Sequence, residues 1–461
     1  MTDGRSVQET LPSGPRRGPG GLTLTELLVA ATLALVVMAT LAGLFGLFGR
    51  SVRRSQATMN QTAILRSAAW QLRQDLAGVT CPIRPWLAPE TNAGYFELVE
   101  GPARDATYAV DGQGQPTSNL TADTDDILVF TTESLAGSFV GRFEGKTVES
   151  PYAEVAWFCR PAANQPVPGT TVYDLHRRQL VVMNYLGRST LADNALSLTT
   201  DQSGCDISLR RGIVTGTAQM LLPNSLGDLT KRENRFMRGG WSFVTEAGST
   251  RSVLAQVFPH AFPRDAATGH AIAEAALDGT KRAFEDVVLT NVIGFDVRVF
   301  DPQAVVSAAA SVTGRLPGDP GYVAATAQPA DALGAYVDLG WGGGTAVART
   351  ETFPPVGQTA LQSAGVAVTA LPRRISLSAP TYDTWSRHYE FNGVDDDGDG
   401  VVDEAVHGVD VNGDGWTELT GDAETSPPYP VPLRGIEVRI RCYEPSSRQV
   451  RQVTIRHSFV D

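Results

Sequence analysis

The chain has 461 residues, 42% of them hydrophobic, and a formal net charge of −12. An acidic chain lacks the excess of lysine and arginine with which proteins bind nucleic acid, so we expect no nucleic-acid partner. Its length is sufficient for a large folded domain in addition to a membrane segment.

The segment from Gly20 to Glu26 reads GGLTLTE and leads directly into an apolar run, Leu27–Gly49. That run has no charged residue and exceeds the roughly 20 apolar residues needed to cross a bilayer. A carboxylate beside such a run is costly unless it is paired, so we expect Glu26 to need a cationic partner. Cleavage after Gly21 would expose the α-amino group of Leu22, which could neutralise Glu26 on the same chain or on a neighbour.

These residues resemble the class III signal of type IV prepilins and type II secretion pseudopilins. Gly21 takes the place before the cut, Leu22 is the first mature residue and Glu26 is the fifth. Phenylalanine is commoner than leucine at the first position, and the leader, residues 1–21, is long and mixed in charge. The alternative is an uncleaved signal anchor.

The resemblance implies cleavage and N-terminal methylation by a prepilin peptidase. It also implies a single pass through the inner (cytoplasmic) membrane, with the globular domain in the periplasm or exterior. Other pilin or pseudopilin subunits are then the partners, joined in a filament in which Glu26 helps to set the register.

Helical spacing continues beyond the membrane edge. From Arg50 to about Leu76 the chain has almost no glycine or proline, and apolar residues recur every three or four positions. These are Ile64, Leu65, Ala68, Ala69, Leu72 and Leu76. We expect one helix over residues 22–78, transmembrane over 22–49 and amphipathic beyond, whose second part packs one face on a globular domain. This plan is similar to that of pilin-like subunits.

Residues 79–461 are predicted to be β-rich. The strongest strand patterns are Tyr95–Val99, Ile127–Thr131, Glu154–Cys159, Gln179–Met183, Ile207–Arg210, Trp241–Val244, Phe295–Phe300, Tyr336–Leu339, Ile436–Cys442 and Val453–Val460. The last two alternate apolar and polar residues, which predicts a C-terminal hairpin with one buried side. The fold class is therefore α+β: a long N-terminal helix packed on a β-rich, pilin-like domain.

Large polar insertions are expected at 105–125 and 303–334, as loops that bury little apolar surface. The domain is either one elaborated unit or two packed units, 79–240 and 241–461. Polar-aromatic strands at Glu154–Arg160 and Asp174–Leu180 give a layout that resembles a large J-type minor pseudopilin or its type IV pilus counterpart.

Four widely spaced cysteines, Cys81, Cys159, Cys205 and Cys442, exclude a CxxC metal or redox site. In an exported domain they permit disulfides in three connectivities, and isolated buried thiols are the alternative.

Two acidic repeats lie within 392–424 and predict structural calcium. Alternating carboxylates around a glycine turn direct several hard oxygens inward, as Ca²⁺ requires. The candidate ligands are Asp395, Asp397, Asp399, Val401 (by its carbonyl), Asp403 and Glu404, then Asp410, Asn412, Asp414, Trp416 (by its carbonyl) and Glu418. The loops resemble EF-hand-like repeats of dockerins and thrombospondin type 3 segments, but the twelfth positions lack glutamate. A solvated acidic loop that binds nothing tightly is the alternative.

Catalysis is not expected. Gly141–Thr147 lacks the first glycine of a phosphate loop, because position 140 is valine, and the histidines have no ligand spacing. We therefore expect a minor pilin-like or pseudopilin-like structural subunit. The alternative is a membrane-anchored, calcium-stabilised surface domain for binding or adhesion.

Overall fold

The computed structural model of the protein describes residues 23–84, 87–101, 122–143, 146–166, 170–183, 196–197, 206–215, 218–230, 234–235, 285–306, 316, 333–339, 381–384 and 431–460. The chain divides into two compact units, Met1–Thr58 and Met59–Asp461.

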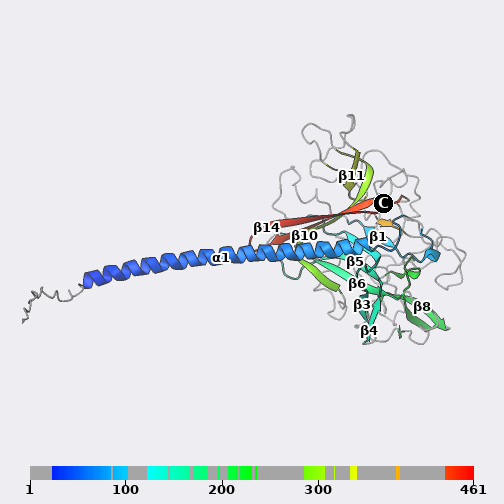
Figure 1. Cartoon of the computed structure of the whole chain (residues 1–461), viewed down its shortest axis with the longest axis horizontal. Coiled ribbons are helices and arrows are strands. Elements are labelled where there is room, and N and C mark those ends of the chain that lie inside the picture. Colours follow the sequence, from blue (N-terminus) through cyan, green and yellow to red (C-terminus); the bar gives the residue numbers. More distant parts are fainter. Residues whose placement is uncertain are drawn as a thin grey trace, which may run out of the picture. The chain divides into compact units, whose positions relative to one another are not determined.

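One unbroken helix, α1 (Leu24–Ala77), confirms the expected 22–78 helix to within two residues at each end. In the first unit its apolar side chains are exposed all round, with Leu35 and Phe45 exposed by 67% and 74%. By length and composition this part is able to cross a membrane. Figure 1 shows α1 as the one long helix of the described chain.

The last turns of α1 belong to the second unit and bury one face there. Leu65, Ala68, Ala69, Leu72 and Leu76 all enter one core with the apolar residues of the strands. The opposite face of these turns is exposed, including Trp70 at 61%. The amphipathic pattern therefore correctly predicted a helix laid on a globular domain.

A nine-stranded antiparallel sheet forms the body of the second unit, in the order β12-β1-β2-β5-β6-β10-β13-β14, with β11 paired to β10. Its strands are β1 (Phe96–Val99), β2 (Ile127–Glu133), β5 (Tyr152–Pro161), β6 (Tyr173–Val182), β10 (Glu285–Val305), β11 (Leu333–Val337), β12 (Thr381–Asp383), β13 (Gly435–Glu444) and β14 (Gln449–Ser458). Strands before and after residue 240 pair directly, since β6 pairs β10. The nine-stranded sheet thus contains strands from both sides of residue 241.

Smaller elements are attached to this sheet. They are the hairpin β3 (Phe139–Phe143) and β4 (Lys146–Ser150), the sheet β7 (Leu196–Ser197), β9 (Ala218–Pro223) and β8 (Leu209–Thr215), and the short helices η1 (Pro89–Thr91) and η2 (Asp228–Thr230). Of the predicted strands, nine coincide with or overlap an observed strand, and Trp241–Val244 lies outside the described residues.

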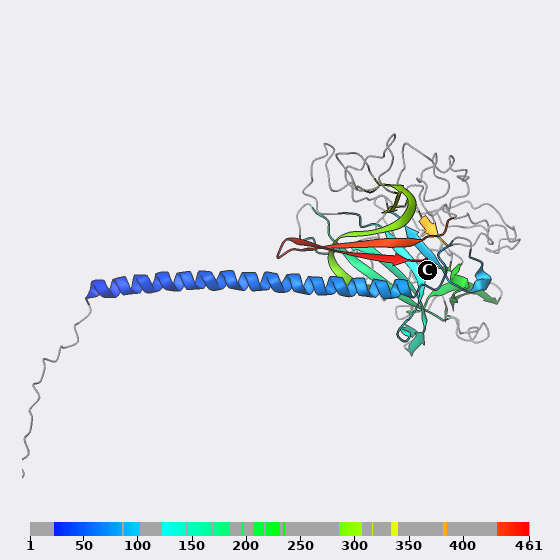
Figure 2. The same ribbon diagram turned by 45° about the horizontal axis from the view of Figure 1, so that its top comes forward.

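The sheet curves around the last turns of α1. Side chains from the helix and from strands along the whole sheet share one core. The ring of Phe459, just after β14, lies 5.4 Å from that of Phe96 in β1, although the two strands are far apart in the sheet order. Figure 2 shows the strands gathered around this end of the helix.

A buried ion pair joins α1 to the sheet. The carboxylate of Asp75 accepts bonds from Arg177 Nε at 2.7 Å and Nη2 at 2.8 Å, and from Trp157 Nε1 at 2.9 Å. All three side chains are buried. A second buried cation, Arg235, bridges Glu97 of β1 and Asp383 of β12 at 2.8 and 3.0 Å.

The described cysteines Cys81, Cys159 and Cys442 are buried thiols, and no disulfide joins any two of them. Burial raises the pKa of the Cys81 and Cys442 thiols to about 12, so both stay neutral at ordinary pH. Cys205 lies outside the described residues.

The expectation of loops at 105–125 and 303–334 is wrong at three boundaries. Residues 122–125 are buried, β10 continues to Val305 with Ala304 in the core, and β11 begins at Leu333. Hydropathy did not reveal the burial of 122–125, because two of the four side chains are carboxylates.

Candidate functional site

The start of α1 holds the sequence-predicted processing residues. Glu26 is described, whereas Gly21 and Leu22 lie outside the described residues. The Glu26 carboxylate accepts bonds from the backbone N–H of Thr23 at 3.0 Å and from its hydroxyl at 2.9 Å. The N–H of Glu26 in turn donates to the Thr23 hydroxyl at 3.3 Å. This reciprocal pattern is a capping box, which satisfies N–H groups that the first turn leaves unbonded.

Thr-x-x-Glu at residues 23–26 is the sequence signature of a capping box, a role of Glu26 beyond the cationic partner expected for it. In the single chain its carboxylate already has two donors from one residue. A carboxylate can accept more than two bonds, so the cap leaves acceptor capacity for a further donor. Glu26 can therefore cap its own helix and still receive an ammonium group.

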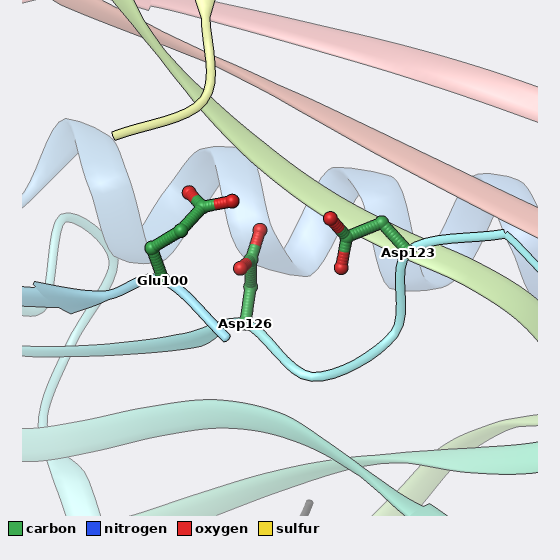
Figure 3. Close-up of side chains that lie close together, drawn as sticks. All are labelled: Glu100, Asp123 and Asp126. Atoms are coloured by element: carbon green, nitrogen blue, oxygen red, sulfur yellow. The ribbon is translucent and has the colours of Figure 1, made fainter. Parts of the chain in front are cut away.

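All eleven predicted calcium ligands, from Asp395 to Glu418, lie outside the described residues. Among the described residues, three other acidic side chains lie close together. Glu100, Asp123 and Asp126 each offer one carboxylate oxygen, and these oxygens lie within 4.8 Å of one another. Figure 3 shows the carboxylates of Glu100 and Asp126 side by side and that of Asp123 facing them.

Backbone hydrogen bonds along β10 hold this acidic group in place. Ala122 N–H donates to Ile293 C=O at 2.6 Å, and Phe295 N–H donates to Asp123 C=O at 2.6 Å. The segment 122–126 therefore runs beside β10 before β2 begins at Ile127. Glu100 directly follows β1, so the pairing of β1 with β2 brings it close to Asp126.

Two carboxylates of the group also accept bonds from the main chain. Asp126 accepts from Val297 N–H at 2.7 Å and from Gly101 N–H at 3.2 Å, and Glu100 accepts from Leu339 N–H at 3.1 Å. At Gly101 a Cβ atom would collide with the Asp125 carboxyl group. Any larger residue there would therefore have to displace the Asp125 side chain.

Electrostatics at this group favour the neutral acids. Burial, reinforced by the nearby Asp126 and Asp125 charges, raises the pKa of Asp123 well above its usual range. Burial also raises the pKa of Asp126, with further contributions from Asp125 and Asp296. Close carboxylates in a low-dielectric site cannot all ionise cheaply.

A buried guanidinium lies at the border of the group. Arg298 ion-pairs with Asp296 at 2.9 Å and with Asp338 at 3.2 Å. The remaining negative charge of the group can be lowered by shared protons or by a hard cation. Its donors are all oxygens, the ligand type that Ca²⁺ and Mg²⁺ prefer.

Sequence reasoning missed this acidic group because Glu100 and Asp123 are separated by a polar segment. The available signal was the acidic run Asp123–Asp126 set directly before the apolar strand β2. Glu100, Asp123 and Asp126 come together through the pairing of β1 with β2 and through contacts to β10. That strand lies more than 150 residues further along the chain.

Comparisons with protein-family models, with curated proteins and with solved structures found no match for this chain.

Proposed function

We propose that the protein is a minor pilin-like or pseudopilin-like structural subunit of a type IV pilus or type II secretion pseudopilus. The observation that carries this proposal is the division of one continuous helix, α1, into two parts. Its first part is apolar and exposed all round, and its last turns are anchored in a β-rich core. Such a helix is suited to two successive environments, a bilayer and a bundle of like helices.

Physical chemistry requires a cover for the first part of α1. From Leu24 to Phe48 the exposed positions include leucine, valine, methionine and phenylalanine side chains. An apolar area of this size is stable only in lipid or against other apolar helices. The proposed life cycle supplies both, first in the inner membrane and then in the filament core.

The residues around Glu26 supply the register in this proposal. A prepilin peptidase cleaves after Gly21 and methylates Leu22, so that a cationic amino group stands one helical turn from each subunit's Glu26. A charge-assisted bond from a neighbour's amino group then adds to the Thr23 cap. An unpaired carboxylate in apolar surroundings would be expensive, which favours the aligned arrangement over a slipped one.

Calcium has a structural role in the same proposal, through the repeats at Asp395–Glu404 and Asp410–Glu418. Their carboxylates would repel one another without a cation, so a bound cation would stabilise the domain that carries them. The globular domain would then be exported and exposed to the millimolar calcium found outside cells.

The first experiment measures the N-terminal mass of the full chain, expressed with and without an active prepilin peptidase. We expect a chain that begins at methylated Leu22 when the peptidase is active. Gly21→Leu should abolish the cut, and Gly20→Ala is the matched control that should not. A chain that keeps its leader under all conditions would contradict the proposal.

The acidic repeats favour a second candidate, a membrane-anchored and calcium-stabilised surface domain for binding or adhesion. The two candidates differ in the effect of deleting the gene. Loss of a subunit should abolish filament assembly or secretion, whereas loss of a binding domain should spare assembly and remove capture of the ligand.

A further inference from the structure

The last strand of the sheet, β14, has a long regular edge. It pairs with β13 over ten consecutive residues, from Gly435↔Ser458 to Glu444↔Gln449, without a register shift. Its other side pairs with none of the described strands, and Gln449, Arg451 and Gln452 are exposed, with Val450 exposed by 45%. An edge of this kind presents a row of N–H and C=O groups that can bond a further strand.

The edge of β14 lacks two common devices that block strand addition. Residues 449–458 contain neither proline nor a bulge, and Val450, Val453, Thr454 and Ile455 favour extended backbone. At the far end Phe459 is held against Phe96. Pairing with β13 fixes the shape of β14, while its residues 449–452, Thr454 and Arg456 are exposed.

The charge around this edge is opposite in sign to that of the chain. Residues 431–460 carry six arginines against two glutamates, while the whole chain has a net charge of −12. One of the glutamates, Glu437, is buried and already bonded by Arg439 at 2.7 Å and Arg456 at 2.6 Å. The charge left facing solvent is therefore positive.

Two arginines of β14 define what would fit beside it. Arg451 is exposed and donates to the neutral side chain of Gln449 at 3.0 Å. Arg456 keeps 68% of its side chain exposed despite its bond to Glu437. They are five residues apart, so they project from opposite faces of the sheet.

We propose that β14 is a docking edge for an acidic extended segment of another protein, which adds to the sheet by main-chain hydrogen bonds. Carboxylates five residues apart on that segment would meet Arg451 and Arg456, one on each face. A second copy of β14 fits less well, because it would bring its own arginines to the same edge and like charges across a strand pair repel. Binding of such a segment to β14 does not depend on whether the protein is a subunit of a filament.

The test uses the full-length protein in detergent micelles and a synthetic ten-residue peptide of valine, threonine and two glutamates placed five residues apart. A peptide with lysines in place of the glutamates is its control. We expect the acidic peptide to bind in fluorescence anisotropy and to slow hydrogen exchange of the amides in residues 449–458. The lysine peptide should bind at least tenfold more weakly.

Arg451→Glu should weaken the acidic peptide at least tenfold and leave the melting temperature unchanged, because this side chain is exposed. Arg73→Glu, on the exposed face of α1, is the matched control and should bind the peptide as the parent does. Equal affinity for both peptides, protection outside β14, or no binding would overturn the proposal. In the last case the arginines would serve only to guard the edge against aggregation.

Discussion

The two ends of α1 each carry one carboxylate, and the two differ in burial and in their hydrogen-bond partners. Glu26 is exposed in the first turn and bonds only within its own helix, to Thr23. Asp75 is buried in the last turn and bonds to Arg177 and Trp157 of the sheet. The first carboxylate is therefore available to other chains, whereas the second is committed to the fold.

The largest effect should come from Asp75→Asn. This change removes a charge that Arg177 faces in a buried site, and breaking such a pair costs about 3–5 kcal/mol. Urea unfolding of the full chain in micelles, followed by the fluorescence of Trp157 and the other tryptophans, would measure the loss. Glu26→Gln is the control at the other end of the helix, and equal destabilisation by both changes would break the contrast.

The apolar faces of α1 should differ in the same way. Leu72 is fully buried, so Leu72→Ala should destabilise the second unit by about 2–5 kcal/mol. Trp70, two residues earlier and on the opposite face of the helix, is mostly exposed, and Trp70→Ala should change the unfolding free energy by no more than about 0.5 kcal/mol. A large loss from Trp70→Ala would mean that the exposed face contributes to the fold of the single chain.

Calcium should stabilise the second unit and leave the first unit unaffected. A ligand at a hundredfold excess over its dissociation constant adds about 2.7 kcal/mol to stability. We expect a higher melting temperature in millimolar Ca²⁺ than in chelator, and loss of that difference when Asp395, Asp397 and Asp399 are changed to Asn. Helicity of the first half of α1 should be the same in both solutions. An unchanged melting temperature in the parent would refute the calcium proposal.

The buried acids beside β10 predict a dependence on pH. Because the pKa of Asp123 is raised in the folded state, the unfolded chain releases this proton first as pH rises. Stability is then fully present below the ordinary pKa of aspartate and is lost as pH rises toward the folded value. The loss is about 1.4 kcal/mol for each unit of pKa difference.

Asp123→Asn should flatten that profile, which melting temperatures between pH 4 and pH 9 would show. Glu133, whose side chain is exposed at the end of β2, is the control site, and its change to Gln should keep the parent slope. If Asp123→Asn retains the full slope, the pH dependence of stability arises from another titratable group. Added Ca²⁺ that cancels the loss at high pH would instead indicate a cation at the same carboxylates.

Local patterns were sufficient to predict much of this fold. The 23-residue apolar run and the spacing of Leu65, Leu72 and Leu76 predicted α1 and its buried face, because helical periodicity is a property of neighbouring residues. The alternation in residues 435–460 likewise predicted the hairpin of β13 and β14. By contrast, the Asp75–Arg177 pair and the bond between Asp123 and Phe295 of β10 join residues separated by about 100 or more positions. Such contacts depend on the strand order, which periodicity does not encode.

The smallest effect on folding should come from Glu26 in the first turn of α1, the residue that the proposed function assigns to filament assembly. Glu26→Gln should leave cleavage intact and change the unfolding free energy of the second unit by less than about 0.5 kcal/mol, because Glu26 is exposed and lies in the first unit. Incorporation into filaments should nevertheless fall. Fractionation of sheared filaments, probed for this protein, would measure it.

Thr23→Val separates the two roles of Glu26. It removes the hydroxyl that donates to the carboxylate but keeps the carboxylate itself. If Glu26 acts only as a helix cap, then Thr23→Val and Glu26→Gln should impair incorporation equally, since both weaken the capping box. If Glu26 pairs with the amino group of a neighbour, Thr23→Val should assemble nearly as well as the parent and Glu26→Gln should not. The second pattern would assign the carboxylate at the start of α1 to the filament and leave the one at its end to the fold.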